Sequence, residues 1–120
     1  MTSMRPAEIA VRVAIIILTA ATAIIHFRQA FLFLIPDILF VLNGLGYLGL
    51  LAALYLPIPQ LSGYKNIIRF VLIGYTALTI ILWFVITGGF GTSIAYIDKV
   101  IEAVLIVMLA IEARFERSRG

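Results

Sequence analysis

The sequence contains no cysteine among its 120 residues, and only 12% of its residues are charged. The missing cysteines exclude disulfide bonds, thiolate metal sites and cysteine nucleophiles. A soluble domain usually has about a quarter of its residues charged and roughly half apolar, whereas 63% are apolar here. The scarcity of charge therefore excludes a soluble globular enzyme and a disordered segment, and it indicates a membrane protein.

Histidine is equally scarce, because His26 is the only one. One chain cannot supply two histidine ligands to a haem, and the sequence has neither an H-x-x-x-H nor an E-x-x-H spacing for a metal ion. It also lacks a Ser-His-Asp arrangement and a P-loop. No basic cluster interleaved with aromatic residues is present to bind nucleic acid. We therefore expect no metal, no cofactor, no nucleic-acid partner and no enzymatic activity.

Long apolar segments dominate the chain. A membrane-spanning helix needs about 20 mostly apolar residues, and four segments approach that length, at 9–27, 38–56, 67–87 and 94–111. Pro36-Asp37, residues 57–63 and residues 88–91 break the pattern between them, and Thr92 or Ser93 is the expected N-cap of the last helix. Because the connections are short, we predict one all-α transmembrane domain over residues 1–120, in which four transmembrane helices form an up-down antiparallel bundle.

The first segment also has features of a signal peptide. Arg5 precedes the apolar stretch, and Ala21-Thr22-Ala23 fits the small-x-small rule for cleavage. The apolar run continues past this point to Phe27, which is longer than a signal core needs. We therefore favour a retained membrane span.

The basic residues are distributed unevenly between the two sides of the predicted bundle. One side carries seven of them, Arg5, Arg12, Lys65, Arg69, Arg114, Arg117 and Arg119, and the other carries only Arg28 and Lys99. Positive residues favour the cytoplasmic side, so we predict a multi-pass protein of the cell membrane with both termini in the cytoplasm. Arg12 and Arg69 lie about one turn inside their helices, where their side chains are expected to snorkel outward. This bias also predicts that any oligomer is parallel.

Glycines gather in the second segment. Gly44, Gly46 and Gly49 match the dinucleotide fingerprint G-x-G-x-x-G, but no strand precedes them and no acidic residue follows at the required distance. Glycine in a membrane helix allows another helix backbone to approach closely, and Gly49 and Ala53 have the small-xxx-small spacing. We therefore interpret Gly44, Gly46, Gly49 and Ala53 as helix-packing residues.

Polar residues gather in the predicted non-cytoplasmic half. The set consists of His26, Arg28, Asp37, Asn43, Asp98, Lys99 and Glu102. Charged groups inside a bilayer usually face the bundle interior or water, and Asp98 and Glu102, four residues apart, share one helix face. At ~1.5 Å per residue, Glu102 lies about 13 Å from the start of its helix and is the deepest ionisable group. The candidate polar or ion site therefore comprises Glu102, Asp98, Lys99, Asn43, Asp37 and His26. A purely structural, mutually neutralising cluster is the alternative.

One connection is itself apolar. Residues 31–35 read Phe-Leu-Phe-Leu-Ile, although they lie between two predicted spans. Such a stretch is expected to lie along the membrane interface. It could instead dock on a partner subunit or a lipid-like ligand.

Three stretches carry a resemblance to a known kind of protein. They are His26, the run from Leu42 to Tyr47, and the run from Tyr96 to Glu102. In these stretches the sequence resembles small uncharacterised four-span membrane proteins of prokaryotes. The resemblance implies the same fold, and it implies no activity and no residue roles.

Two functions are compatible with this pattern. The first is association: an accessory or scaffold subunit of a larger membrane complex, or a small homo-oligomer, with the lipid bilayer and other membrane subunits or further copies as partners. The glycine-rich face and the apolar connection favour it. The alternative is a small proton- or ion-coupled transporter or channel that uses the polar cluster.

Overall fold

The computed structural model describes residues 4–31 and 37–119 of the chain. Within these ranges the chain forms no strand and five helical elements: α1 (Pro6–Ala30), α2 (Ile38–Tyr55), the 3₁₀ helix η1 (Pro59–Tyr64), α3 (Lys65–Thr87) and α4 (Ser93–Arg119). The all-α prediction is confirmed, and each predicted segment falls on one α-helix. Helix α4 continues past the predicted end at residue 111. Residues 32–36, which include most of the apolar connection, lie outside the described residues.

Local sequence signals set the helix ends. Pro6 occupies the first turn of α1, where a missing N–H costs nothing. The Asp37 carboxylate caps α2 by accepting a hydrogen bond from the Leu39 amide at 3.0 Å. Gly88 ends α3 in the left-handed conformation, with φ of 68°. The Thr92 hydroxyl accepts from the Ala95 amide at 3.3 Å, which makes Thr92 the N-cap of α4.

The connection between α2 and α3 folds back on α2. The Lys65 ammonium donates hydrogen bonds to the carbonyl oxygens of Ala53 at 2.7 Å and Leu56 at 2.9 Å. These carbonyls belong to the last turn of α2, which has no further helical partners for them. A positive charge at a helix C-terminus also interacts favourably with the helix dipole. Lys65 therefore holds the start of α3 against the end of α2.

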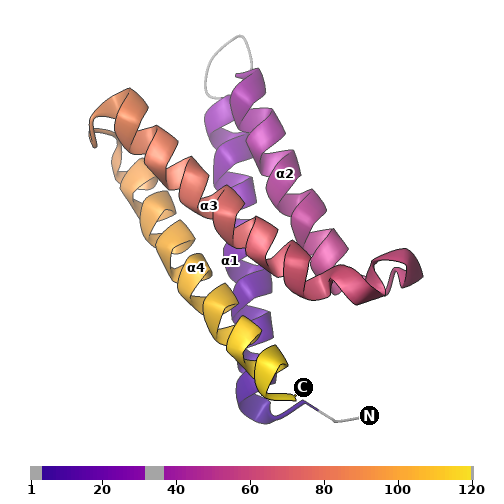
Figure 1. Cartoon of the computed structure of the whole chain (residues 1–120). Helices are drawn as coiled ribbons and strands as arrows, with labels where there is room; N and C mark the ends of the chain where they lie inside the picture. The colour runs from indigo at the N-terminus through magenta and orange to yellow at the C-terminus, as the bar shows by residue number, and fades with distance from the viewer. Residues whose placement is uncertain (1–3, 32–36, 120) are drawn as a thin grey trace.

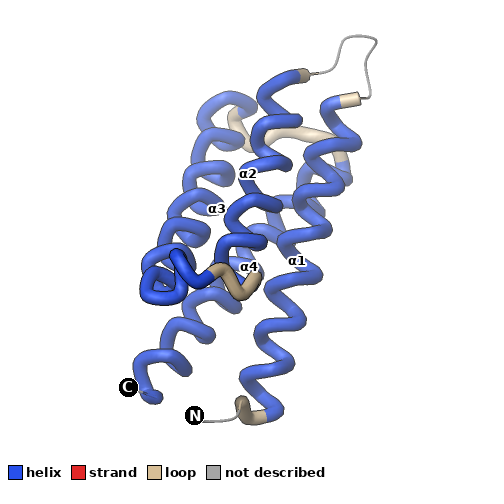
Figure 2. Tube along the Cα trace, turned by 90° about the vertical axis from the view of Figure 1, so that its right-hand side faces the viewer, coloured by secondary structure: helices blue, strands red, loops and turns tan. Residues whose placement is uncertain are grey.

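The four α-helices pack in a ring in which α1 contacts α2 and α4, and α3 contacts α4 and, less extensively, α2. The start of α1 and the end of α4 lie at one end of the bundle (Figures 1 and 2), as an up-down arrangement requires. Figure 1 also shows that α3 starts beside the end of α2, passes in front of α1 and diverges from α2 toward the upper end of the view. Residues of both helices border a cavity in that half of the bundle.

Three helical segments are long and apolar enough to cross a membrane: Pro6–Ala30, Ile38–Tyr55 and Pro59–Thr87. Helix α4 has sufficient length, but Asp98, Lys99 and Glu102 lie in its first half and give it more charge than the other three. A membrane association is therefore supported by three helices, and the fourth span remains a prediction.

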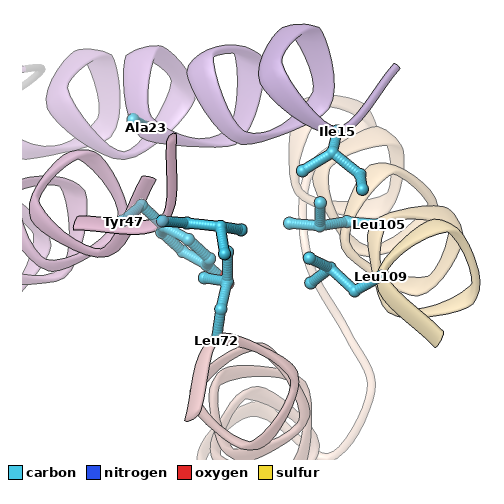
Figure 3. Packing of buried hydrophobic residues seen from close by; sticks show 7 residues of the cluster. Ile15, Ala23, Tyr47, Leu72, Leu105 and Leu109 are labelled. Carbon is cyan, nitrogen blue, oxygen red and sulfur yellow. The ribbon is translucent and has the colours of Figure 1, made fainter. Parts of the chain in front are cut away.

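The bundle is apolar outside and mixed inside. Seven buried hydrophobic residues form a cluster between the helices, of which Figure 3 labels all but Leu54: Ile15, Ala23, Tyr47, Leu54, Leu72, Leu105 and Leu109. As many polar as apolar residues are buried among those the structure describes, while large apolar side chains such as Ile86, 79% exposed, cover the surface. This distribution suits a molecule whose solvent is lipid, because lipid accepts apolar side chains and excludes charged ones.

The glycines of α2 face three different surroundings. A Cβ atom on Gly44 would lie 3.0 Å from the Phe27 ring of α1, and one on Gly46 would lie 2.2 Å from the Tyr75 hydroxyl oxygen of α3. A Cβ atom on Gly49 would meet nothing within 4 Å. Two of the three glycines therefore serve close packing inside one chain, and Gly49 faces outward. The half-buried Ala53 contributes its carbonyl to Lys65.

Candidate functional site

Four helices bring polar side chains into two separate clusters. The first, which we call the His26 cluster, consists of Thr22 and His26 on α1, Tyr47 on α2, and Asp98, Lys99 and Glu102 on α4. Four of the six predicted site residues belong to it. The two that do not, Asp37 and Asn43, lie nearby on α2 and line a cavity beside the cluster.

Asp98 and His26 face each other at the α1–α4 contact. The Thr22 hydroxyl donates to Asp98 Oδ1 at 2.6 Å, and His26 Nε2 lies 4.0 Å from Asp98 Oδ2. On the other side of the ring, His26 Nδ1 lies 2.7 Å from the Thr22 carbonyl oxygen. A carbonyl can only accept, so Nδ1 carries the proton in the neutral ring. Nε2 is then the nitrogen that can accept a proton or a metal ion, next to a carboxylate.

Glu102 lies deepest in the cluster and is 0% exposed. Its carboxylate accepts hydrogen bonds from the Tyr47 hydroxyl and from the Lys99 ammonium, one on each oxygen. Lys99 Nζ also lies 3.3 Å from Asp98 Oδ2. A single ammonium group therefore pairs with both carboxylates of the cluster, and Tyr47 links the cluster to α2.

The cluster has an excess of negative charge. Two carboxylates against one ammonium leave one net negative charge when both acids are ionised and His26 is neutral. One ligand atom each from His26, Asp98 and Glu102 lies within 4.8 Å of the others, so these three side chains could hold a cation. The sequence predicted no metal here, because no local spacing joins residues that come from two helices. The arrangement is suited to accepting one further positive charge.

Two cavities reach the cluster. The larger, about 480 Å³, lies between α2 and α3 and is bordered by His26, Lys99, Asn43 and several apolar residues. The smaller, about 160 Å³, lies between α1, α2, α3 and α4 and is bordered by His26, Asp98 and Lys99. Trp83 borders both. The cluster is therefore buried in the bundle and still accessible from one side.

Asn43 has an unusual environment at the edge of the larger cavity. Its side-chain oxygen Oδ1 is buried and has no hydrogen-bond partner among the residues that the structure describes. Its backbone carbonyl accepts from the Tyr75 hydroxyl at 2.8 Å. Buried polar atoms nearly always have a partner, so an unpaired acceptor needs an explanation. A donor in the cavity would satisfy it.

The second polar cluster was not predicted from the sequence. We call it the Arg69 cluster, and it comprises Arg12 on α1, Tyr55 on α2, Arg69 on α3 and Glu112 on α4. Glu112 Oε1 accepts from Arg69 Nε at 2.7 Å and from the Tyr55 hydroxyl at 2.8 Å, and Oε2 accepts from Arg12 Nε at 3.4 Å. One carboxylate thus joins all four helices.

The expectation that Arg69 snorkels outward is wrong. Arg69 is 2% exposed, and it also donates to Asn66 Oδ1 at 2.8 Å. Its partner Glu112 lies one residue past the predicted end of the fourth span. The signal that could have found the pair was Arg69 itself, since an arginine inside a predicted span needs a counter-ion.

No protein-family model, no curated protein and no solved structure matches the chain.

Proposed function

We propose that the protein is a small membrane transport protein that binds a proton or a cation at the His26 cluster. The observation that carries the proposal is a buried pair of carboxylates, Asp98 and Glu102, which share one ammonium next to a cavity, with His26 beside Asp98. Transport requires a site that takes up and releases charge. This cluster has one more carboxylate than ammonium groups, and a cavity borders it. The proposed activity is binding and movement, with no covalent chemistry.

The cost of burying charge supports a functional role. A charged side chain at membrane depth costs roughly 2.5–3.5 kcal/mol on insertion scales. The His26 cluster buries two carboxylates that share one ammonium group. Such intramembrane groups commonly mark ion or substrate pathways.

The proposal includes a membrane orientation. We place α4 across the bilayer as the fourth span and both termini in the cytoplasm, because the positive charges favour that side. The His26 cluster and its cavities then lie in the non-cytoplasmic half. A reporter fused to the C-terminus and active only outside the cytoplasm would contradict this orientation.

Flux in proteoliposomes tests the function. Wild-type protein is reconstituted and supplied with gradients of protons, sodium, potassium and small organic amines, with a pH-sensitive dye inside the vesicles. We expect flux for at least one of these species, and its loss in Glu102→Gln. The same substitution at Glu116, near the other end of α4, is the matched control and should leave flux unchanged. Absence of flux from the wild type across the panel, or full flux from Glu102→Gln, would overturn the proposal.

Association is a second proposal, supported by Gly49. This glycine faces outward, and nothing lies within 4 Å of where its Cβ would be. With Ala53 four residues on, it offers a surface that another helix can approach closely. We expect a parallel oligomer or a complex with another membrane subunit in mild detergent, weakened by Gly49→Leu. A monomer from native membranes, in both the wild type and the variant, would contradict this second role.

A further inference from the structure

We propose that the cavity between α2 and α3 binds a hydrophobic organic cation, an ammonium group on an apolar or aromatic body. The inference rests on the proposed function and names its substrate class. It combines three independent features of the larger cavity: its charge, its walls and one unpaired hydrogen-bond acceptor.

The charge around the cavity favours a cation. Asp37 and Lys99 border it directly, and Asp98 and Glu102 lie behind Lys99. Three carboxylates stand against one ammonium, and neutral His26 adds none. Low-dielectric walls strengthen both the attraction of these carboxylates for a cation and their repulsion of an anion. An anionic ligand would add to the negative excess, whereas an ammonium reduces it.

The walls favour an apolar body with an ammonium head. Leu78, Leu82 and Ile86 of α3 form one side, and the rings of Phe40, Tyr75 and Trp83 border the rest. Aromatic ring faces attract cations. The chain already uses this attraction, because Lys99 Nζ lies 5.9 Å from the centre of the Trp83 ring. The cavity thus joins an aromatic cation site to apolar side walls.

The unpaired acceptor gives the ligand a hydrogen-bonding head. Asn43 Oδ1 is buried beside the cavity and has no partner in the described part of the chain. A buried acceptor without a hydrogen-bond partner destabilises the protein. An ammonium N–H satisfies it, whereas a carboxylate ligand only accepts. A quaternary ammonium would leave this oxygen unpaired, so the geometry favours amines that carry N–H groups.

Exposed apolar side chains border the cavity. Ile86, at its rim, is 79% exposed, and Leu39 and Leu78 are exposed as well. These residues belong to the two helices that diverge in Figure 1. A hydrophobic amine concentrates in the bilayer and would reach the site between α2 and α3 from there.

Trp83 provides a direct probe, since it is the only tryptophan of the chain and borders the cavity. Its fluorescence is followed in nanodiscs, with no gradient, during titration with three molecules of matched shape: phenylbutylammonium, phenylbutanol and phenylbutyrate. We expect saturable quenching by the ammonium, at least about tenfold tighter than by the other two. Equal or tighter binding of phenylbutyrate would overturn the proposal, and so would the absence of saturable binding of the ammonium.

Three variants separate the contribution of the cavity's charge from that of its hydrogen-bond acceptor. Glu102→Gln should weaken ammonium binding by about tenfold, and Lys99→Gln should strengthen it several-fold, because it removes the competing cation. Asn43→Leu keeps every charge and removes only the acceptor, so the folded variant should bind several-fold more weakly. Weaker ammonium binding by Lys99→Gln, or unchanged binding by Asn43→Leu, would contradict the inference.

This binding assay is independent of the flux assay. Ammonium binding without flux of any tested species would overturn the transport proposal and support the substrate class. Proton or metal-ion flux without ammonium binding would support the transport proposal and overturn the substrate class.

Discussion

The two polar clusters of the bundle differ in charge balance and in access. The Arg69 cluster surrounds one carboxylate with two guanidinium groups and a tyrosine, and neither cavity reaches it. The His26 cluster has two carboxylates for one ammonium, and two cavities border it. The first has the form of a structural cross-link, and the second has the form of a binding site.

The comparison shows that burial of charge alone does not identify a functional site. Glu102 and Glu112 are both buried, both accept from a tyrosine of α2 and both lie on α4. What separates them is the number of positive partners and the space beside them. The following experiments test that difference, in order of expected effect.

The largest effect is expected from Glu112→Gln. This change removes the carboxylate that pairs with the guanidinium groups of Arg12 and Arg69. Breaking a buried ion pair by removing one partner costs about 3–5 kcal/mol. Unfolding by SDS in mixed micelles measures the loss.

Glu102→Gln is the counterpart in the other cluster. It should cost less than Glu112→Gln, because Lys99 keeps Asp98 as a partner. If the two substitutions destabilise the protein equally, the distinction between a cross-link and a binding site is wrong.

Gly46→Ala is expected to disturb the His26 cluster through packing. The new Cβ would lie 2.2 Å from the Tyr75 hydroxyl oxygen. The Tyr75 ring packs edge-on against the Tyr47 ring, with 4.9 Å between the ring centres. Overpacking costs about 1–3 kcal/mol, which the same unfolding assay detects.

Gly49→Ala is the matched control. With nothing within 4 Å of its Cβ, alanine should be neutral or should stabilise the helix by up to about 1 kcal/mol. A larger loss for Gly49→Ala than for Gly46→Ala would show that the close packing lies elsewhere.

The two tyrosines of α2 sharpen the comparison further. Tyr55→Phe and Tyr47→Phe each remove one hydrogen bond to a buried glutamate, and each should cost about 1–3 kcal/mol of stability. Only Tyr47→Phe should also change binding of phenylbutylammonium, measured by Trp83 fluorescence. An altered affinity in Tyr55→Phe at unchanged stability would connect the Arg69 cluster to the site.

The smallest effect on stability is expected from Asn43→Leu. The amide oxygen of Asn43 makes no hydrogen bond within residues 4–31 and 37–119, so its removal should be neutral or stabilise the protein by about 1 kcal/mol. A clear loss of stability would indicate that Asn43 supports the bundle rather than a ligand.

The helices followed from the sequence, because apolar length and turn residues such as Pro36 and Gly88 are local signals. The site followed in part. The i, i+4 spacing of Asp98 and Glu102 placed both on one face, and depth along the helix singled out Glu102. His26 joined them because it ends the first span at the same predicted side.

The contacts between residues of different helices could not be predicted from the sequence. Nothing in the sequence marks Tyr47 as a partner, and Thr22 stands out only as part of a possible cleavage site, although both donate to the acids of α4. The sequence likewise predicts that Arg69 snorkels outward, and it does not single out Glu112. Which residues meet depends on how α1 to α4 rotate about their axes, and a near-uniform apolar surface gives the sequence no periodic signal for that rotation.

The central claim is that the His26 cluster carries the function and the Arg69 cluster holds the fold. It is tested most directly by comparing flux through Glu102→Gln and Tyr55→Phe in parallel proteoliposome preparations, each confirmed as folded. The account predicts that Glu102→Gln abolishes the wild-type flux and that Tyr55→Phe retains it. Flux retained by Glu102→Gln and lost in Tyr55→Phe would contradict it.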